Sequence, residues 1–333
     1  MNPSNPKVPS GRTLLVLGAG ASRAVSYNHE GRIPSPLDGD FRDLLSRLNK
    51  IPGKSLENDI REVIRLLGGL PLHLQKSMER SFYTLHLRAL MSKTLGVKSD
   101  QSESDIVRLF ARVIGALLRD AHGKRVCKKH QVLFERLKQS DCIILFNYDL
   151  VPERVFKSIR DDSPWGDWVY ARKAPKPNYR FPPLFKLHGS MNWRRDGEKL
   201  PINTKAWSDF EKAYGYAAHS HGSGTDFPIF LPFWDKRIEK NPWKEIWVNA
   251  FNRAKGSRNV IVWGYSLPHT DIKSERFFDL ALKSGEAVHL CVIDPSNSTK
   301  DRWRETLPMA SWYSYDSFEK FESDPPEWWT SKD

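Results

Sequence analysis

Cysteine is scarce in this sequence, and long apolar runs are absent. The chain of 333 residues has three cysteines, Cys127, Cys142 and Cys291, which are too few and too far apart for a disulfide framework. No apolar run approaches the length of about 18 residues that a membrane-spanning helix needs. The polar, proline-rich start, MNPSNPKVPSGR, lacks the apolar segment of a signal peptide. These absences predict a cytoplasmic protein without a membrane segment.

Acidic residues are outnumbered, because 52 lysines and arginines face 40 aspartates and glutamates, which leaves a net charge of +12. Such a balance suggests nucleic-acid binding, but the basic residues are spread along the chain. The densest cluster is HGKRVCKKH, from His122 to His130. A solvated helix end or an anionic nucleotide partner would explain this cluster equally well. Nucleic-acid binding is therefore kept as an alternative only.

Four segments have the short, β-branched and continuously apolar pattern of strands that are buried on both faces of a parallel sheet. They are Thr13 to Gly18, Cys142 to Phe146, Asn259 to Gly264 and Ala287 to Asp294. Open α/β sheets bind their ligands at the carboxyl ends of such strands. The sequence therefore predicts an α/β fold, a Rossmann-like parallel sheet with helices on both faces and a helical insertion.

The stretch between the first two strands has helical periodicity. Its clearest helix, SESDIVRLFARVIGALLRDAH, carries a single apolar stripe, and Ser102 followed by Asp105 resembles a capping box at its start. The expected organisation is an α/β domain over 1–40 and 140–300, a helical insertion module over 41–139 and a C-terminal tail over 301–333.

The chain changes character after residue 161. Prolines cluster in KAPKPNYRFPP, and all twelve tryptophans lie at or beyond Trp165, so 161–247 is expected to form long loops and short elements over the sheet. Further on, TDIKSERFFDLALKSG predicts a helix with Asp271 near its positive end and Gly285 as its stop.

Glycine gathers at the end of the first predicted strand, in LLVLGAGASRAV. As a dinucleotide fingerprint this stretch fails at its third position, where Arg23 stands, and no strand ends in an acidic residue about twenty positions later. These departures disfavour a dehydrogenase. Two interpretations remain: a tight turn without a ligand, or a nucleotide phosphate held by the amides around Ala19 to Ser22 with help from the Ser22 hydroxyl.

Polar side chains follow two further apolar runs. Asn147 and Asp149 flank an aromatic residue in LFNYDLV, and His188 precedes a glycine in LFKLHGSMNW. Asn and Asp favour turns in any case, and a lone histidine is more often structural than catalytic. Each residue alone is therefore weak evidence for a site.

The order of the motifs is more specific than any single motif. GAGAS, FNYD, KLHGS, WGYSLPHTD and VIDPS follow one another between Gly18 and Asp294. This order resembles that of sirtuin-like domains, and in particular their divergent bacterial branch, whose members hydrolyse NAD in antiphage defence. The resemblance implies that the α/β domain binds NAD and that the chain is an NADase.

The resemblance also implies individual roles. Asn147 would lie against the nicotinamide ribose and its attacking water, Asp149 near the carboxamide, and His188 would be the base that contacts the ribose hydroxyls. The residues implied in binding the pyrophosphate and the adenosine ribose are Gly18, Ala19, Gly20, Ser22, Gly264, Ser266 and Asp294.

One departure from the family pattern concerns zinc. Protein-deacetylating sirtuins hold a structural zinc with two Cys-x-x-Cys pairs, whereas no cysteine lies between His188 and Gly264 here. His219 and His221 alone cannot form a four-ligand site, so we expect no zinc. The acyl-lysine cleft is in doubt for the same reason. The family's Gly-Ile-Pro-x-Phe-Arg loop is matched only loosely, by RIPSPLDGDFRD, so Asp38, Asp40 and Arg42 receive no role.

Hydrolysis fits the predicted residues, because nicotinamide departs neutral and needs no acid, while a carboxylate, a neutral His188 and a water-orienting amide stabilise the ribose cation. Two alternatives stay open. One is an NAD-dependent deacylase or ADP-ribosyltransferase, and the other a nucleotide-sensing or nucleic-acid-binding subunit of a defence complex. We expect the protein to form a homo-oligomer. An ATPase or nuclease partner is possible, and so is a nucleic acid or phage component as the trigger of activity.

Overall fold

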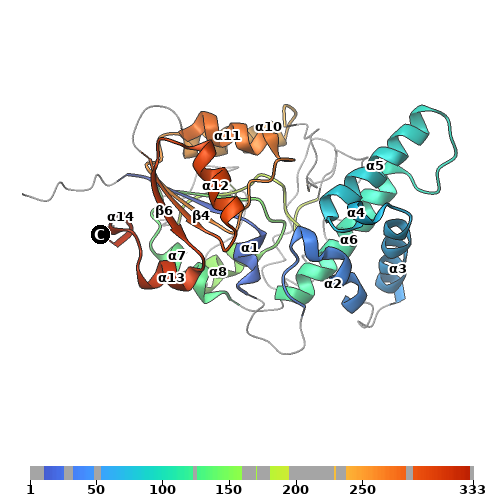
Figure 1. The fold of residues 1–333 in the computed structure, drawn as a ribbon, viewed down its shortest axis with the longest axis horizontal. Helices are drawn as coiled ribbons and strands as arrows, with labels where there is room; N and C mark the ends of the chain where they lie inside the picture. Colours follow the sequence, from blue (N-terminus) through green and yellow to red (C-terminus); the bar gives the residue numbers. More distant parts are fainter. Residues whose placement is uncertain are drawn as a thin grey trace, which may run out of the picture.

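The computed structural model describes residues 11–25, 33–48, 54–122, 126–159, 170, 181–194, 229, 238–282 and 288–330. A twisted sheet with helices around it forms one part of the molecule, and a separate group of helices lies beside it (Figure 1). Among the described residues, no helix is both long and apolar enough to cross a membrane.

The sheet has six parallel strands in the order β3-β2-β1-β4-β5-β6. This is the strand order of Rossmann folds, so the predicted fold class is confirmed. The four predicted strands are present, and β3 and β6 are additional. The strands are β1 (Thr13–Leu17), β2 (Cys142–Leu145), β3 (Leu184–Lys186), β4 (Asn259–Trp263), β5 (His289–Ile293) and β6 (Ser311–Tyr315).

The order of the strands reverses at β1. This strand pairs with β2 on one side and with β4 on the other, and Leu17 lies level with both Leu145 and Trp263. The chain thus leaves three neighbouring strands at the same edge of the sheet. In open α/β sheets, ligands bind at the carboxyl edge where the strand order reverses, so the topology places a candidate site after Leu17.

Helices cover both faces of the sheet, which explains why its central strands are apolar throughout. In Figure 1, α10, α11 and α12 lie over one face, and α7, α8 and α13 over the other. The helices of this domain are α1 (Ala19–Arg23), α7 (Lys128–Glu135), α8 (Val151–Ile159), α10 (Trp243–Ala254), α11 (Ile272–Leu282), α12 (Asn297–Thr306), α13 (Phe318–Ser323) and α14 (Glu327–Thr330).

A second group of helices, the helical module, lies at the carboxyl edge of the sheet (Figure 1). Its elements are η1 (Asp38–Asp40), α2 (Phe41–Leu48), α3 (Lys54–Gly68), α4 (Leu72–Gln75), α5 (Met78–Thr94) and α6 (Glu103–His122). The module has its own apolar core, in which the ring of Phe110 lies 5.8 Å from Phe41 and 5.2 Å from Phe82. The main-chain N–H of Asp105 donates to the Ser102 hydroxyl at 3.2 Å, which confirms the predicted cap of α6.

The helix α7 falls inside the expected module boundaries 41–139 but packs elsewhere. Leu133 and Phe134 belong to the core of the sheet, and the ring of Phe134 lies 4.8 Å from that of Phe156 on α8. The described helices of the module therefore end with α6 at His122. The stretch 161–247 lies mostly outside the described residues, as does Gly285.

The expectation of a C-terminal tail over 301–333 is wrong. Strand β6 extends the sheet by pairing with β5, and Phe318, Phe321, Trp328 and Trp329 are buried in the core of the sheet. The pattern was misleading because β6 is an edge strand with an exposed or half-buried side chain at every position, so its sequence lacks the apolar run of the central strands.

Truncation of the side chain of Trp329 tests whether the C-terminal segment is part of the core. We expect Trp329→Ala to lower the free energy of unfolding by about 3–5 kcal/mol, because a large side chain that is 2% exposed is removed from the core. Met309→Ala is the control, since Met309 is 92% exposed. Chemical denaturation measures both variants. Equal stability of Trp329→Ala and the wild type would mean that the segment is dispensable.

Two buried histidines make the stability of the folded protein depend on pH. His130 on α7 packs 4.6 Å from the ring of Trp263, and its Nδ1 has no hydrogen-bond partner among the described residues. Burial lowers the pKa of His130 to about 3, and burial likewise lowers the pKa of His122 to about 4. Both values lie below the ordinary value of about 6.5. The unfolded chain therefore binds more protons, and stability is lost as the pH falls from about 6.5 through these folded-state values.

Substitution of His130 by Phe should flatten this dependence. The ring packing is kept while one proton-binding group disappears, so the slope of unfolding free energy against pH should decrease by up to about 1.4 kcal/mol per pH unit between pH 6 and 4. Urea denaturation over that range measures the slope. His73→Phe, at an exposed histidine, should leave it unchanged. An unaltered slope in His130→Phe would contradict the assignment.

Candidate active site

A cavity of about 980 Å³ opens at the carboxyl edge of the sheet. Residues that follow each of the six strands line it, and α2, α5 and α6 of the helical module close its other side. Its volume is at the upper end of the range for small-molecule and cofactor sites, about 300–1,000 Å³. The cavity therefore lies where the reversal of strand order predicts a ligand.

The turn after β1 and the turn after β4 approach each other very closely. A Cβ atom on Gly18 would lie 2.3 Å from the carbonyl oxygen of Gly264, and one on Gly264 would lie 2.3 Å from the main-chain nitrogen of Ala21. Gly264 also has a φ of 63°, which side chains rarely tolerate. The N–H of Gly20 donates to the Gly264 carbonyl at 3.0 Å and joins the two turns.

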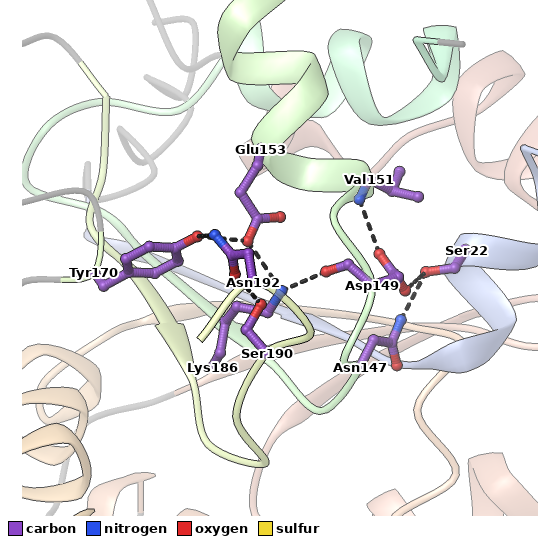
Figure 2. A network of polar contacts seen from close by, with 9 residues as sticks. All are labelled: Ser22, Asn147, Asp149, Val151, Glu153, Tyr170, Lys186, Ser190 and Asn192. Atoms are coloured by element: carbon purple, nitrogen blue, oxygen red, sulfur yellow. Dashed lines mark hydrogen bonds and ion pairs between the residues drawn. The ribbon is translucent and has the colours of Figure 1, made fainter. Parts of the chain in front are cut away.

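A chain of hydrogen bonds links the ends of β1 and β2 (Figure 2). Asn147 Nδ2 donates to the Gly18 carbonyl and to Ser22 Oγ, both at 2.7 Å. Ser22 Oγ donates in turn to Asp149 Oδ2 at 2.6 Å, and the N–H of Val151 donates to Asp149 Oδ1 at 2.9 Å. The Ser22 hydroxyl is thus engaged with Asp149 inside the protein.

Asp149 is ionised although it is buried. Burial alone would raise the pKa of its carboxyl group, but electrostatic interactions with His122 and Lys186 and the hydrogen bonds from Ser22 and Val151 lower it below the usual range. A fixed negative charge therefore stands at the end of β2 over the ordinary pH range. Such a charge favours cationic groups in the cavity that it lines.

A buried ion pair lies beside Asp149 (Figure 2). Lys186 Nζ contacts Glu153 Oε1 at 2.9 Å with both side chains fully buried, and it also donates to the main-chain carbonyl of Asp149. Tyr170 donates to the same Glu153 oxygen at 2.9 Å. Removing one partner of such a pair leaves a buried charge uncompensated. Lys186 therefore fixes both α8 and the loop after β2 against β3, the strand that leads to His188.

His188 pairs with a carboxylate that the sequence patterns did not connect to it. Its Nε2 lies 2.8 Å from Asp271 Oδ2, and the Tyr265 hydroxyl donates to the same oxygen at 3.0 Å. The ring of Tyr265 stacks on Phe146 with 3.8 Å between centroids, and Phe146 meets the His188 ring edge-on at 5.0 Å. The imidazole is therefore held on two sides.

The cavity continues past β4 to the ends of β5 and β6. Asp294 lines it with a carboxyl group whose pKa is raised by burial, and one carboxylate oxygen accepts from the N–H of Ser296 at 2.8 Å. Lys129 and Phe318 lie beyond and also line the cavity. Part of the basic cluster HGKRVCKKH thus reaches the site, whereas Lys124 and Arg125 lie outside the described residues.

The helical module supplies acidic side chains at the opposite end. Asp38 and Glu79 line the cavity together with Tyr148, and their charges, with that of Asp271, add to burial in raising the pKa of the Tyr148 hydroxyl. Asp40, which received no role from the sequence, forms an ion pair with Arg23 at the rim. This end of the cavity is electronegative.

Most of the residues singled out in the sequence meet at this cavity, although they come from five different strand ends. Gly18 and Ser22 are not among the lining residues and act on the turn behind it. The structure adds Glu79 and Lys129 to the lining residues and Asp271 as the partner of His188, and sequence reasoning missed all three. Of these three residues, only Asp271 was singled out individually in the sequence, and only because it stands near the start of a predicted helix. The lining residues among those predicted are Ala19, Gly20, Asn147, Asp149, His188, Gly264, Ser266 and Asp294.

The predicted absence of zinc stays a prediction. Among the residues that the structure describes, no group of three or more metal-ligating side chains occurs. His219 and His221 lie outside that part of the chain.

Comparisons with known proteins find similar solved structures but no matching family model or curated protein. A solved structure of a Sir2 protein with a p53 peptide and NAD+ is similar over 94% of this chain and 92% of that chain, with 13% identity and a TM-score of 0.42. A Sir2 homologue in complex with NAD is similar over 97% and 90%, with 14% identity and a TM-score of 0.40. At these values neither likeness assigns a function, and the fold class rests on the strand order.

Substitution of Gly264 tests the close approach of the two turns. We expect Gly264→Ala to abolish binding of NAD, the predicted ligand, and to lower the melting temperature, because its Cβ would displace Gly20 and Ala21. Gly256→Ala is a matched control: its φ is 77°, but its Cβ would meet only the end of the Arg12 side chain. The control should cost about 1 kcal/mol of stability and leave binding intact. Calorimetric titration with NAD that finds normal affinity in Gly264→Ala would contradict the assignment.

Proposed function

We propose that the protein is a sirtuin-like NAD hydrolase that cleaves NAD+ to nicotinamide and ADP-ribose. The observation that carries the proposal is the single cavity along the carboxyl edge of the sheet. It joins the glycine turn after β1 to Asn147 and His188 at one end and to Asp294 at the other. A dinucleotide needs such an elongated site, with polar groups for a pyrophosphate between two ribose sites.

The electrostatics of the cavity support a cationic substrate group. The nicotinamide ring of NAD+ carries a positive charge, and the ionised Asp149 lines the end of the cavity that also holds Asp38 and Glu79. At the other end, the Asp294 carboxylate suits the hydroxyls of a ribose, as acidic residues do at strand ends in dinucleotide-binding folds. The pyrophosphate would then lie against the turns at Ala19 and Gly264.

The chemistry asks little of the protein beyond electrostatics and a positioned water. The bond between nicotinamide and C1′ of the ribose breaks, and its electron pair neutralises the departing ring. The ribose becomes oxocarbenium-like, as in glycoside hydrolysis. Asn147 orients the water whose oxygen bonds to C1′, Asp149 stabilises the cation, and His188 accepts the proton that the water releases. One proton is left over, and it passes from His188 to solvent.

Water is a better candidate than an acyl-lysine as the second reactant. Side chains of the helical module, among them Met78, Ile114 and Leu117, line the cavity opposite the strand ends. The sequence also lacks the two cysteine pairs of the deacetylating sirtuins. The missing cysteine pairs support hydrolysis over deacylation.

The biological setting is proposed from the motif resemblance alone. We propose an antiviral effector of the abortive-infection type, cytoplasmic and oligomeric, that depletes NAD when a partner or a phage component activates it. The partner would be an ATPase or nuclease subunit or a nucleic acid, and a nucleic acid would suit the net charge of +12.

Nicotinamide release from NAD+ tests the function. We expect His188→Gln to lower kcat by at least about 100-fold, the lower range for loss of a general base, while keeping a donor toward Asp271 and hence a near-normal melting temperature. His289→Gln, at the amino end of β5, is the matched control and should be fully active. Chromatography of the products measures both. A wild-type protein that neither binds NAD by calorimetry nor releases nicotinamide would contradict the proposal.

A further inference from the structure

Asp271 is a buried carboxylate that three different groups approach. It is 1% exposed and stands directly before the first residue of α11. Its Oδ1 accepts from the N–H of Ser274 at 3.3 Å, which makes it the N-cap of that helix. Its Oδ2 accepts from Tyr265 at 3.0 Å and lies 2.8 Å from His188 Nε2. A cap alone explains only the first of these contacts.

The segment that carries Asp271 is also held from the module side. Thr270 Oγ1 donates to Glu79 Oε2 on α5 at 3.2 Å, and the N–H of Glu79 donates to Asp38 Oδ1 at 2.8 Å. Trp303 Nε1 donates to the Tyr265 carbonyl at 2.9 Å. The carboxylate is therefore fixed in place when it meets His188.

A carboxylate in this position determines which nitrogen of the imidazole carries the proton. Carboxylate oxygens only accept hydrogen bonds, so Nε2 of a neutral His188 must be protonated and donate to Asp271. The acceptor lone pair of the ring is then on Nδ1. When His188 takes up a proton, the same carboxylate stabilises the imidazolium, as the aspartate of a Ser-His-Asp triad does.

We propose that Asp271 is a positioning residue for His188: it fixes the Nε2-protonated form of the neutral ring, leaves Nδ1 as the base, and stabilises the imidazolium that forms. This inference rests on the proposed function, because it assigns His188 a proton to accept. Asp271 is not among the residues that line the cavity, so it acts through His188 and not on the substrate.

The groups around the imidazole are consistent with this role. The ring of Tyr148 lies 6.5 Å from that of His188, and Phe146 meets it edge-on. The hydroxyl of Tyr265 points to the carboxylate and not to the imidazole. The carboxylates Asp38 and Glu79 act on Tyr148 from the module, whereas Asp271 contacts the His188 ring directly.

Asp271→Asn separates a structural role from a positioning role. Asparagine is as good an N-cap as aspartate, so its amide oxygen should stay on the Ser274 N–H, which turns the NH2 group toward His188. Nε2 must then become the acceptor and Nδ1 the protonated nitrogen. We expect kcat for NAD+ cleavage to fall by about 10²–10⁴-fold, with KM changed less than about threefold and the melting temperature nearly unchanged. Asp279→Asn on the same helix is the matched control and should be fully active, because Asp279 is not among the residues that line the cavity.

The protonation state of the His188 ring can be measured even if the protein shows no catalytic activity. Nitrogen-15 NMR of histidine-labelled protein, with His188 assigned by the loss of its signals in His188→Gln, should show Nε2–H in the wild type and Nδ1–H in Asp271→Asn. A wild-type ring protonated on Nδ1, or an active enzyme whose kcat stays within twofold in folded Asp271→Asn, would overturn the inference. If Asp271→Asn fails to fold, the wild-type spectrum alone decides. Absence of NAD binding in the wild type would refute the proposed function. The NMR spectrum would still test whether Asp271 fixes the proton of His188 on Nε2.

Discussion

The rest of the site depends on the hydrogen bonds that the side-chain amide of Asn147 donates. Its two N–H bonds close the gap between the end of β2 and the turn after β1, where Gly18 and Ser22 lie. Ser22 is thereby aimed at Asp149, and a chain of hydrogen bonds of this kind strengthens each of its members in a low-dielectric interior. A side chain without both donors would leave the buried Gly18 carbonyl or the Ser22 hydroxyl without this partner.

This contact matters because the fold brings many chain segments to one edge without fixing their side chains. Parallel strands end level with one another, but each turn leaves in a different direction. The Asn147 chain fixes the turns after β1 and β2, the Lys186–Glu153 pair fixes the loop after β2 against β3, and the Asp271 carboxylate fixes His188. The helical module then closes the cavity with acidic side chains, which makes one end suitable for a cation.

Much of this arrangement could be predicted from the sequence, and the remainder could not for physical reasons. The central strands and the cap of α6 follow from continuous apolar runs and a local hydrogen-bonding pattern. Strand β6 could not be found in this way, because an edge strand needs no apolar run. Asp271 was visible only as a helix start, since its contact with His188 spans 83 residues. Lys129 belonged to a cluster whose charge suggested surface binding, and only the fold shows it at the cavity.

The most direct test of the proposed NAD site is a crystal structure of the His188→Gln protein with NAD+. We expect the pyrophosphate to lie against the turns at Ala19 and Gly264, the nicotinamide ribose between Asn147 and residue 188, and the adenosine ribose at Asp294. A dinucleotide bound in the opposite direction, with its adenine end at Asn147, or bound outside this cavity, would contradict it.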